Sequence, residues 1–131
     1  MTAETTPQKG FRSRCSIART LDILGDRWTL LIVRDLMWHG KHTFGALQDS
    51  EERVPTNILA NRLKLLEAHG LLARIPYQSR PVRHRYELTE FGRSLEPVLL
   101  KLMEWGHERL GGGAFDPVTR TSWNADADAT G

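Results

Sequence analysis

Residues 54–70 read VPTNILANRLKLLEAHG and combine apolar and polar side chains with the period of an α-helix. At about 100° per residue, three leucines fall on one stripe, namely Leu59, Leu63 and Leu66. The opposite side carries Asn57, Asn61 and Lys64. Amide and ammonium groups can contact base edges and phosphates, but a solvated surface helix has the same polarity. The pattern alone leaves both interpretations open.

Two helices are predicted before residue 41. Apolar residues at helical spacing mark the first, namely Ile17, Leu21 and Leu24, and Gly25 would end it. Asp26 is a good cap for the second helix, which Gly40 would end. The expected buried stripe of this second helix consists of Trp28, Leu31, Ile32 and Leu36.

A short third helix, TFGALQ, can begin with Thr43 as its cap, and Thr56 can cap the helix that Gly70 ends. The link between these two helices is only residues 50–55. Two consecutive helices joined in this way, the second polar on its outer face, form a helix-turn-helix arrangement.

The runs LARIPYQ and VRHRYEL predict a β-hairpin with a turn at Ser79, Arg80 and Pro81. Its inward residues are expected to be Ile75, Tyr86 and Leu88. Residues 53–86 carry seven basic residues and one acid, a local net charge of +6 that favours a polyanionic partner. A basic hairpin after such a helix is a wing. The predicted fold class is therefore mainly α with a small β-hairpin, a winged helix-turn-helix.

The last helical segment, from Thr89 to Leu110, contains Pro97, which should kink or restart it. Its apolar side chains cover an arc of roughly 160°, whereas packing on one core needs a stripe of about 100°. These residues are Leu95, Val98, Leu99, Leu102, Met103, Trp105 and Leu110. The excess predicts contact with a second subunit.

Both ends of the chain lack hydrophobic periodicity. Residues 1–10 are polar, and residues 111–131 begin with GGG and end in NADADATG, so both are expected to be flexible tails around one domain over 11–110. The sequence has no apolar run near the roughly 18 residues of a membrane span and no export signal at its start. We therefore expect a cytoplasmic protein, with no membrane partner.

Four motifs in this order make the chain resemble the HxlR family of winged helix-turn-helix transcription regulators: CSIARTLDILGDRWTLLIVRDL, HTFGALQ, VPTNILANRLKLLEAHGLLAR and HRYELTEFG. The resemblance spans nearly all of residues 15–110. It implies a homodimer joined through its first and last helices, with two recognition helices in successive major grooves of a palindromic double-stranded DNA operator. The matching DNA-binding positions are Thr56, Asn57, Asn61, Arg62 and Lys64 in the helix and Arg80 and Arg83 in the wing.

Two positions depart from the family pattern. Thr43 stands where members often have an arginine, so a phosphate contact is either absent or made by the Thr43 hydroxyl. Arg85 stands where an acid is often found before Tyr86, which leaves its pairing partner open. Arg62 lies beside the leucine stripe, so it either clamps the fold or reaches a flanking phosphate.

Cys15 is the single cysteine, which excludes an intramolecular disulfide and a cluster of thiolate metal ligands. It stands at or just before the cap of the first helix, where the helix dipole, Arg14 and Arg19 favour a thiolate. By resemblance, a cysteine at this position senses oxidants or quinones. The alternative is a small buried residue that serves packing.

Other chemistry finds little support in the sequence. The five histidines, at positions 39, 42, 69, 84 and 107, lack metal-ligand spacing, so we expect no metal or other cofactor. No nucleophile has a base near it, so we expect no enzyme. Trp28, Trp38 and Trp105 could line a pocket for a small aromatic effector, or they could be core or dimer interface.

The sequence therefore predicts a sequence-specific DNA-binding transcriptional regulator, a repressor that acts as a homodimer. Whether Cys15 makes it responsive to oxidants or electrophiles, or only serves packing, stays open. Two other classes remain open. One is a winged-helix module that binds only proteins. The other is a small-molecule-binding protein or enzyme built in the dimer cleft.

Overall fold

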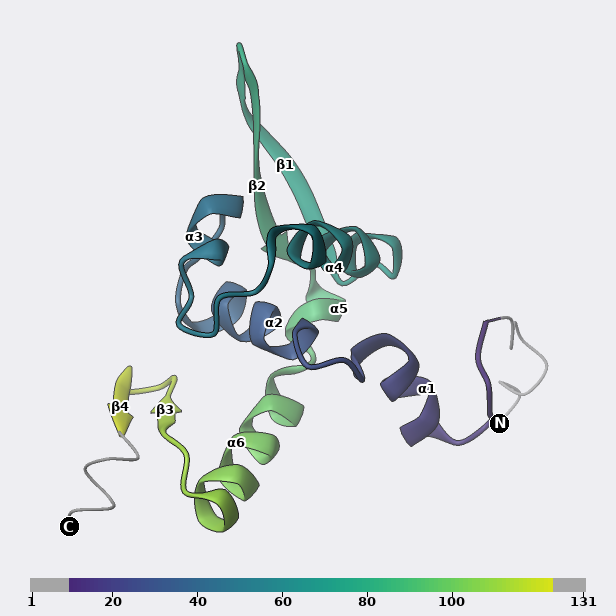
Figure 1. Ribbon diagram of the computed structural model, residues 1–131, viewed down its shortest axis with the longest axis vertical. Helices are drawn as coiled ribbons and strands as arrows, with labels where there is room; N and C mark the ends of the chain where they lie inside the picture. Colours follow the sequence, from purple (N-terminus) through teal and green to yellow (C-terminus); the bar gives the residue numbers. More distant parts are fainter. Residues whose placement is uncertain (1–9, 124–131) are drawn as a thin grey trace.

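The computed structural model describes residues 10–123 of the chain. Within these residues the elements follow in the order α1 (Ser16–Leu24), α2 (Thr29–Trp38), α3 (Phe44–Gln48), α4 (Thr56–Ala68), β1 (Leu72–Ser79), β2 (Val82–Leu88), α5 (Glu90–Arg93), α6 (Glu96–Leu110), β3 (Ala114–Asp116) and β4 (Thr121–Trp123). The β1–β2 hairpin projects from the body next to α4 (Figure 1). The predicted fold class is confirmed: a mainly helical chain in which α3, α4 and the hairpin form a winged helix-turn-helix.

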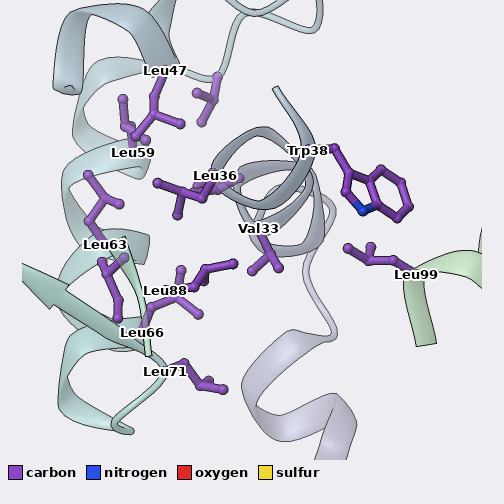
Figure 2. Packing of buried hydrophobic residues seen from close by; sticks show 13 residues of the cluster. Val33, Leu36, Trp38, Leu47, Leu59, Leu63, Leu66, Leu71, Leu88 and Leu99 are labelled. Carbon is purple, nitrogen blue, oxygen red and sulfur yellow. The ribbon is translucent and has the colours of Figure 1, made fainter. Parts of the chain in front are cut away.

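The core lies where α2, α4 and the base of the hairpin meet. The leucine stripe of α4 is completely covered or nearly so, with Leu59 and Leu66 at 0% exposure. Figure 2 shows these leucines turned toward Val33 and Leu36 of α2. Burial of each such side chain contributes about 1.5–3 kcal/mol. The stripe therefore sets the rotation of α4 about its axis and determines which residues face outward.

The expected stripe of α2 is confirmed in part. Ile32 and Leu36 are buried, whereas Trp28 and Leu31 are half-buried at the margin of the core. Gly40, with φ +64°, follows the helix end as expected. The most buried residues of α2 also include a charged one, Asp35.

Three residues were predicted to cap helices, and two of them, Thr43 and Asp26, do so. The Thr43 hydroxyl accepts a hydrogen bond from the Ala46 amide, and the Asp26 carboxylate accepts from the amides of Trp28 and Thr29. The prediction that Thr56 caps α4 is wrong. Thr56 is already the first helical residue, after an extended Pro55, and its hydroxyl accepts a hydrogen bond from Gln48 instead.

The wing is an antiparallel pair that runs from Leu72 opposite Leu88 to Ser79 opposite Val82, so Arg80 and Pro81 form the turn. Leu88 is buried and Tyr86 half-buried, as predicted. The prediction that Ile75 points inward is wrong, because 38% of this residue is exposed. Beyond its first residues β1 leaves the body of the domain, and nothing in the described chain covers its outer part.

The last helical segment restarts at Pro97, as predicted. The short helix α5 ends at Arg93, and α6 begins at Glu96 with Pro97 in its first turn. Thr89 links this region to the wing base, because its hydroxyl donates to the Gly70 carbonyl and accepts from the Gly92 amide. Gly92 lies against the chain so closely that a Cβ there would meet the Leu71 carbonyl oxygen at 2.1 Å.

The prediction of a tail from residue 111 onward is wrong for residues 114–123, which form the β3–β4 hairpin. Phe115 packs against Trp38 and His39 with ring centroids 5.9 and 4.9 Å apart. The Arg120 guanidinium donates to the Trp38 carbonyl at 2.8 Å. These contacts with residues far away in the chain hold the hairpin in place. Residues 1–9 and 124–131 of the predicted tails lie outside the described residues.

Candidate nucleic-acid interface

The outer face of α4 brings together three predicted DNA-binding residues. Asn57, Asn61 and Lys64 are all exposed, one turn apart along the side opposite the buried leucines. The amide of asparagine can bond both to N6 and to N7 of adenine, and lysine can reach guanine or a phosphate. The geometry of α4 is therefore suited to entering a major groove.

The wing supplies positive charge beside this helix. Arg74, Arg80 and Arg83 are exposed along β1, the turn and β2. Figure 1 shows the hairpin extending well beyond the body from a base close to α4. Arg85, whose partner the sequence left open, has its Nε 2.9 Å from the Glu87 carboxylate. Arg80 and Arg83, the two predicted wing contacts, are thus exposed at the turn and close to it.

Thr43 and Thr56 lie at the starts of the two helices of the helix-turn-helix. Each hydroxyl accepts a hydrogen bond from the protein, at 3.2 Å from the Ala46 amide and at 2.8 Å from Gln48 Nε2 respectively. Because a hydroxyl that accepts a bond keeps its own proton, each can still donate to a phosphate oxygen. Both residues are exposed.

Arg62 faces the protein body. Its Nη1 lies 3.5 Å from the carboxylate of Asp26, the residue that caps α2. Burial works against the charged form of Asp26, yet hydrogen bonds from Thr29 and Trp28 and the charge of Arg62 outweigh it and lower the pKa of Asp26. The structure therefore shows the clamp between α4 and α2, which is one of the two readings that the sequence left open.

A polar cluster that the sequence analysis missed fixes the segment before α4. Arg34 donates to both carboxylate oxygens of Glu52 at 2.8 and 2.9 Å and also pairs with the buried Asp35. The Ser50 hydroxyl donates to Asp35 and accepts from Lys41. Hydrogen bonds from Arg34 are the main cause that lowers the pKa of Glu52 to about 2. The sequence held one sign of this cluster: Asp35 is an acid within the otherwise mainly apolar run LLIVRDLMW, and a buried acid needs polar partners.

Cys15 occupies the N-terminal cap of α1, as predicted, and its side chain is exposed. Packing in the core of its own chain therefore does not account for this residue. Figure 1 shows α1 extending away from the body of the domain, which contains the recognition helix α4.

The structure does not bring the three tryptophans together. Trp38 is buried beneath the β3–β4 hairpin, Trp28 is half-buried at the edge of the core, and Trp105 is 59% exposed on α6. They line three separate depressions of the surface. Within residues 10–123 the three tryptophans therefore do not frame one pocket.

The histidines do not gather either. His42 contacts the backbone of the wing, with its Nδ1 2.8 Å from the Tyr86 carbonyl oxygen. Within residues 10–123 no group of three or more His, Cys, Asp or Glu side chains could hold a metal ion. In the same part of the chain, no helix is long and apolar enough to cross a membrane.

Comparison with known proteins agrees with this geometry. A family model described as HxlR-like helix-turn-helix matches residues 23–112. The HTH-type transcriptional regulator Rv3095 of Mycobacterium tuberculosis is 44% identical over 95 residues, which cover 72% of this chain and 59% of that protein. The chain thus spans less than two thirds of the length of this relative.

Two solved structures are also similar. The reduced form of the transcriptional regulator YodB from Bacillus subtilis is 30% identical with a TM-score of 0.61, over 74% of this chain and 95% of that chain. The redox regulator HypR in its oxidized form is 35% identical with a TM-score of 0.63, over 72% and 97%. With a family match over most of its length and a winged helix-turn-helix in place, the chain belongs to the HxlR-like helix-turn-helix family of DNA-binding transcriptional regulators.

Proposed function

We propose that this protein is a sequence-specific DNA-binding repressor that acts as a homodimer on a palindromic operator. The observation that carries the proposal is the outer face of α4, where Asn57, Asn61 and Lys64 are exposed above a completely buried leucine stripe. The family consists of transcriptional regulators, which are generally not enzymes.

Base contacts and phosphate contacts come from different elements in this proposal. Asn57 and Asn61 read base edges in the major groove, and Lys64 contacts a guanine or a phosphate. Arg80 and Arg83 of the wing contact the backbone or the minor groove, while Thr43 and Thr56 donate to phosphates beside the helix-turn-helix. Arg62 acts through its ion pair with Asp26, which holds α4 in position.

A homodimer is supported by two apolar surfaces that nothing in the described chain covers. On α6, Val98, Leu102 and Trp105 line an open groove of about 440 Å³. On α1, Ile17 is 71% exposed and Leu21 is 52% exposed. An exposed apolar surface of this kind marks an interaction site. In the proposed dimer, α1 and α6 of one copy pack against the same helices of the other.

Repression is the proposed action because a dimer that binds across a promoter through two recognition helices excludes RNA polymerase from it. The check is transcription in vitro from a promoter that contains the operator. We expect the protein to lower the transcript level, and a rise would contradict repression.

The recognition surface is tested by alanine variants and fluorescence anisotropy on an operator selected from genomic DNA. Asn61→Ala and Lys64→Ala should weaken the specific complex by about 1–3 kcal/mol each. Arg93→Ala is the control, because it removes an exposed positive charge from α5, outside the proposed contact surface. Equal affinity of the α4 variants and wild type would place the binding surface elsewhere. Absence of any DNA binding would favour a module that binds only proteins.

Regulation through Cys15 is the second part of the proposal. The thiol is exposed at the start of α1, and one solved relative is the redox regulator HypR. In an oxidation by diamide, two Cys15 thiols from two copies lose two protons and two electrons, form one disulfide and reduce diamide to its hydrazine. The bond would pull on α1 and thereby change the separation of the two α4 helices.

This second part has its own test. Diamide or a quinone should change the operator affinity of wild type and leave Cys15→Ser unaffected. Gels without reductant should show the cross-linked dimer for wild type only. An identical response of both proteins would refute the switch.

A further inference from the structure

A cleft of about 790 Å³ lies between α2, α6 and the β3–β4 hairpin. Its apolar wall comes from all three elements and includes Leu30, Leu99, Leu102, Met103 and Phe115. Figure 2 shows Leu99 of α6 beside Trp38, which also lines the cleft. Volumes of this size accommodate small organic ligands.

The hairpin that closes one side of this cleft is held at several points. The Phe115 amide donates to the Met103 sulfur at 3.1 Å, and the Arg120 guanidinium donates to the Trp38 carbonyl while it lies over the Phe115 ring. The family match ends at residue 112, so this wall is formed by residues beyond it. The β3–β4 hairpin therefore forms a wall of the cleft that is held in place by these contacts.

The charged residues at the rim favour one sign of ligand. Arg34, Glu51, Glu52 and His39 line the cleft. The guanidinium of Arg34 is already engaged by Glu52 and Asp35. Glu51 has no ion pair within residues 10–123 and is exposed. Partial desolvation lowers the pKa of His39, which disfavours the protonated form of its ring. Two further cations lie near the rim: Arg120 donates to the Trp38 carbonyl and lies over the Phe115 ring, and Lys41 donates to Ser50. Glu52 is paired with Arg34, so Glu51 is the carboxylate of the lining that has no ion pair in the described chain.

We propose that this cleft binds an apolar organic cation, with its aromatic or aliphatic body against the wall and its positive charge near Glu51 and Glu52. An anion of the same size would have to draw Arg34 away from Glu52, or Arg120 away from the Trp38 carbonyl and the Phe115 ring. Loss of one partner from a charge-assisted pair is unfavourable, whereas a cation leaves the pair intact. Charge complementarity therefore selects the cation.

The site also connects to the DNA-binding surface, a step that rests on the proposed function. Glu51 and Glu52 belong to the segment directly before α4, and Arg53 in this segment has φ +57°, a conformation that residues other than glycine seldom adopt. A cation drawn to Glu51 adds a contact to the segment that positions the recognition helix, while the Arg34–Glu52 pair stays in place. Bound ligand should therefore change operator affinity.

Calorimetric titration of the full chain with a matched pair of ions tests the binding. Tetraphenylphosphonium and tetraphenylborate have nearly the same size and apolar surface and opposite charge. We expect the cation to bind with micromolar affinity and the anion at least tenfold more weakly. Equal binding of both ions, tighter binding of the anion, or binding of neither would overturn the proposal.

Two variants in the cleft and one control variant outside it locate the site. Glu51→Gln should weaken tetraphenylphosphonium binding about fivefold, because it removes one partly solvated charge contact. Glu108→Gln makes the same chemical change at an exposed position of α6 outside the cleft and should bind like wild type. Ala114→Trp places an indole in the cleft and should abolish binding, with circular dichroism as the check on folding. Wild-type affinity of Glu51→Gln would overturn the assignment.

Anisotropy with the selected operator measures the coupling. Saturating tetraphenylphosphonium should change operator affinity of wild type severalfold and have less effect on Glu51→Gln at the same concentration. Unchanged operator affinity with the cation bound would refute the coupling. Failure of the protein to bind any DNA would contradict the proposed function alone, because the calorimetric titration contains no DNA.

Discussion

The carboxylate of Glu52 receives two hydrogen bonds from Arg34, which lower its pKa from 4.5 to about 2. Above pH 4.5 this carboxylate is ionised in both the folded and the unfolded chain, so the ion pair contributes fully to stability. As the pH falls from about 4.5 to about 2, the unfolded chain takes up the proton first, and the contribution disappears. The side chain is 36% exposed, so we expect solvent to reduce the contribution to about 1 kcal/mol.

The corresponding prediction concerns Glu52→Gln. At neutral pH this variant should unfold at a lower urea concentration than wild type, because its free energy of unfolding is lower by about 1 kcal/mol. The difference between the two free energies should shrink as the pH falls toward 2. Glu51→Gln, its neighbour without an ion pair in the described chain, should behave like wild type. A pH-independent difference for Glu52→Gln would show that the ion pair is not the cause.

Gly92 tests how tightly α5 fits against the base of the wing. Gly92→Ala should lower the free energy of unfolding by about 1–3 kcal/mol, because the new Cβ would lie 2.1 Å from the Leu71 carbonyl oxygen and the backbone must shift. Gly45→Ala is the matched control. A Cβ there meets nothing within 4 Å, and alanine favours the helix. Equal urea midpoints for the two variants would contradict the close approach.

The sequence predicted which residues of α4 are buried, but it did not predict which partners the polar side chains bind. The leucine stripe of α4 was predictable because its period alone determines which side is buried. The partners of Arg62 and Thr56 were not predictable, because Asp26 and Gln48 reach them across the fold and no local spacing records such contacts. The same holds for Arg34 and Glu52, 18 residues apart.

At the scale of elements, α4 and the wing should respond differently to salt. Arg80→Ala should weaken binding to all DNA sequences alike and reduce the slope of log affinity against log salt by about one unit. Asn61→Ala should weaken only the operator complex and keep the slope, because an amide releases no counterion. Titrations at several salt concentrations distinguish the two. A loss of sequence preference in Arg80→Ala would contradict this division.

The terminal helices carry the prediction on assembly. Leu21→Asp on α1 and Trp105→Asp on α6 should each shift the protein from dimer to monomer, because a carboxylate in an apolar interface loses its solvation. Val118→Asp is the control, since Val118 is 89% exposed on the turn of the C-terminal hairpin. Sedimentation equilibrium gives the mass of each variant. Dimers of both helix variants would place the interface elsewhere.

Truncation after Gly92 should remove the same interface and also expose the core, because Leu99 of α6 is buried against Trp38. We expect the truncated chain to lose both solubility and dimerisation. A shortened protein that sediments as a folded dimer would contradict the role of α6.

Among the elements, the sequence predicted all that have strong periodicity or clear caps. It missed the β3–β4 hairpin, because three-residue strands beside a run of glycines carry no periodic signal. The hairpin depends on Phe115 and Arg120, which contact Trp38 far away in the chain. Such long-range contacts decide the structure of short segments that have little preference of their own.

At the scale of the whole molecule, the protein combines a fixed recognition unit with two exposed apolar surfaces. Arg62 with Asp26, and Arg34 with Glu52, fix α4 and the segment before it to α2. The apolar faces of α1 and α6 lie on other parts of the molecule (Figure 1). A two-fold dimer through these helices would present two copies of α4 to the same side of a DNA duplex.

The most direct test of the central claim is a footprint on fragments selected from genomic DNA. We expect one protected region that contains an inverted repeat with half-site centres one helical turn apart, about 34–36 Å. Asn61→Ala should lose this footprint at protein concentrations where wild type protects fully. Selection that enriches no fragment, or a footprint without an inverted repeat, would contradict a dimeric, sequence-specific regulator.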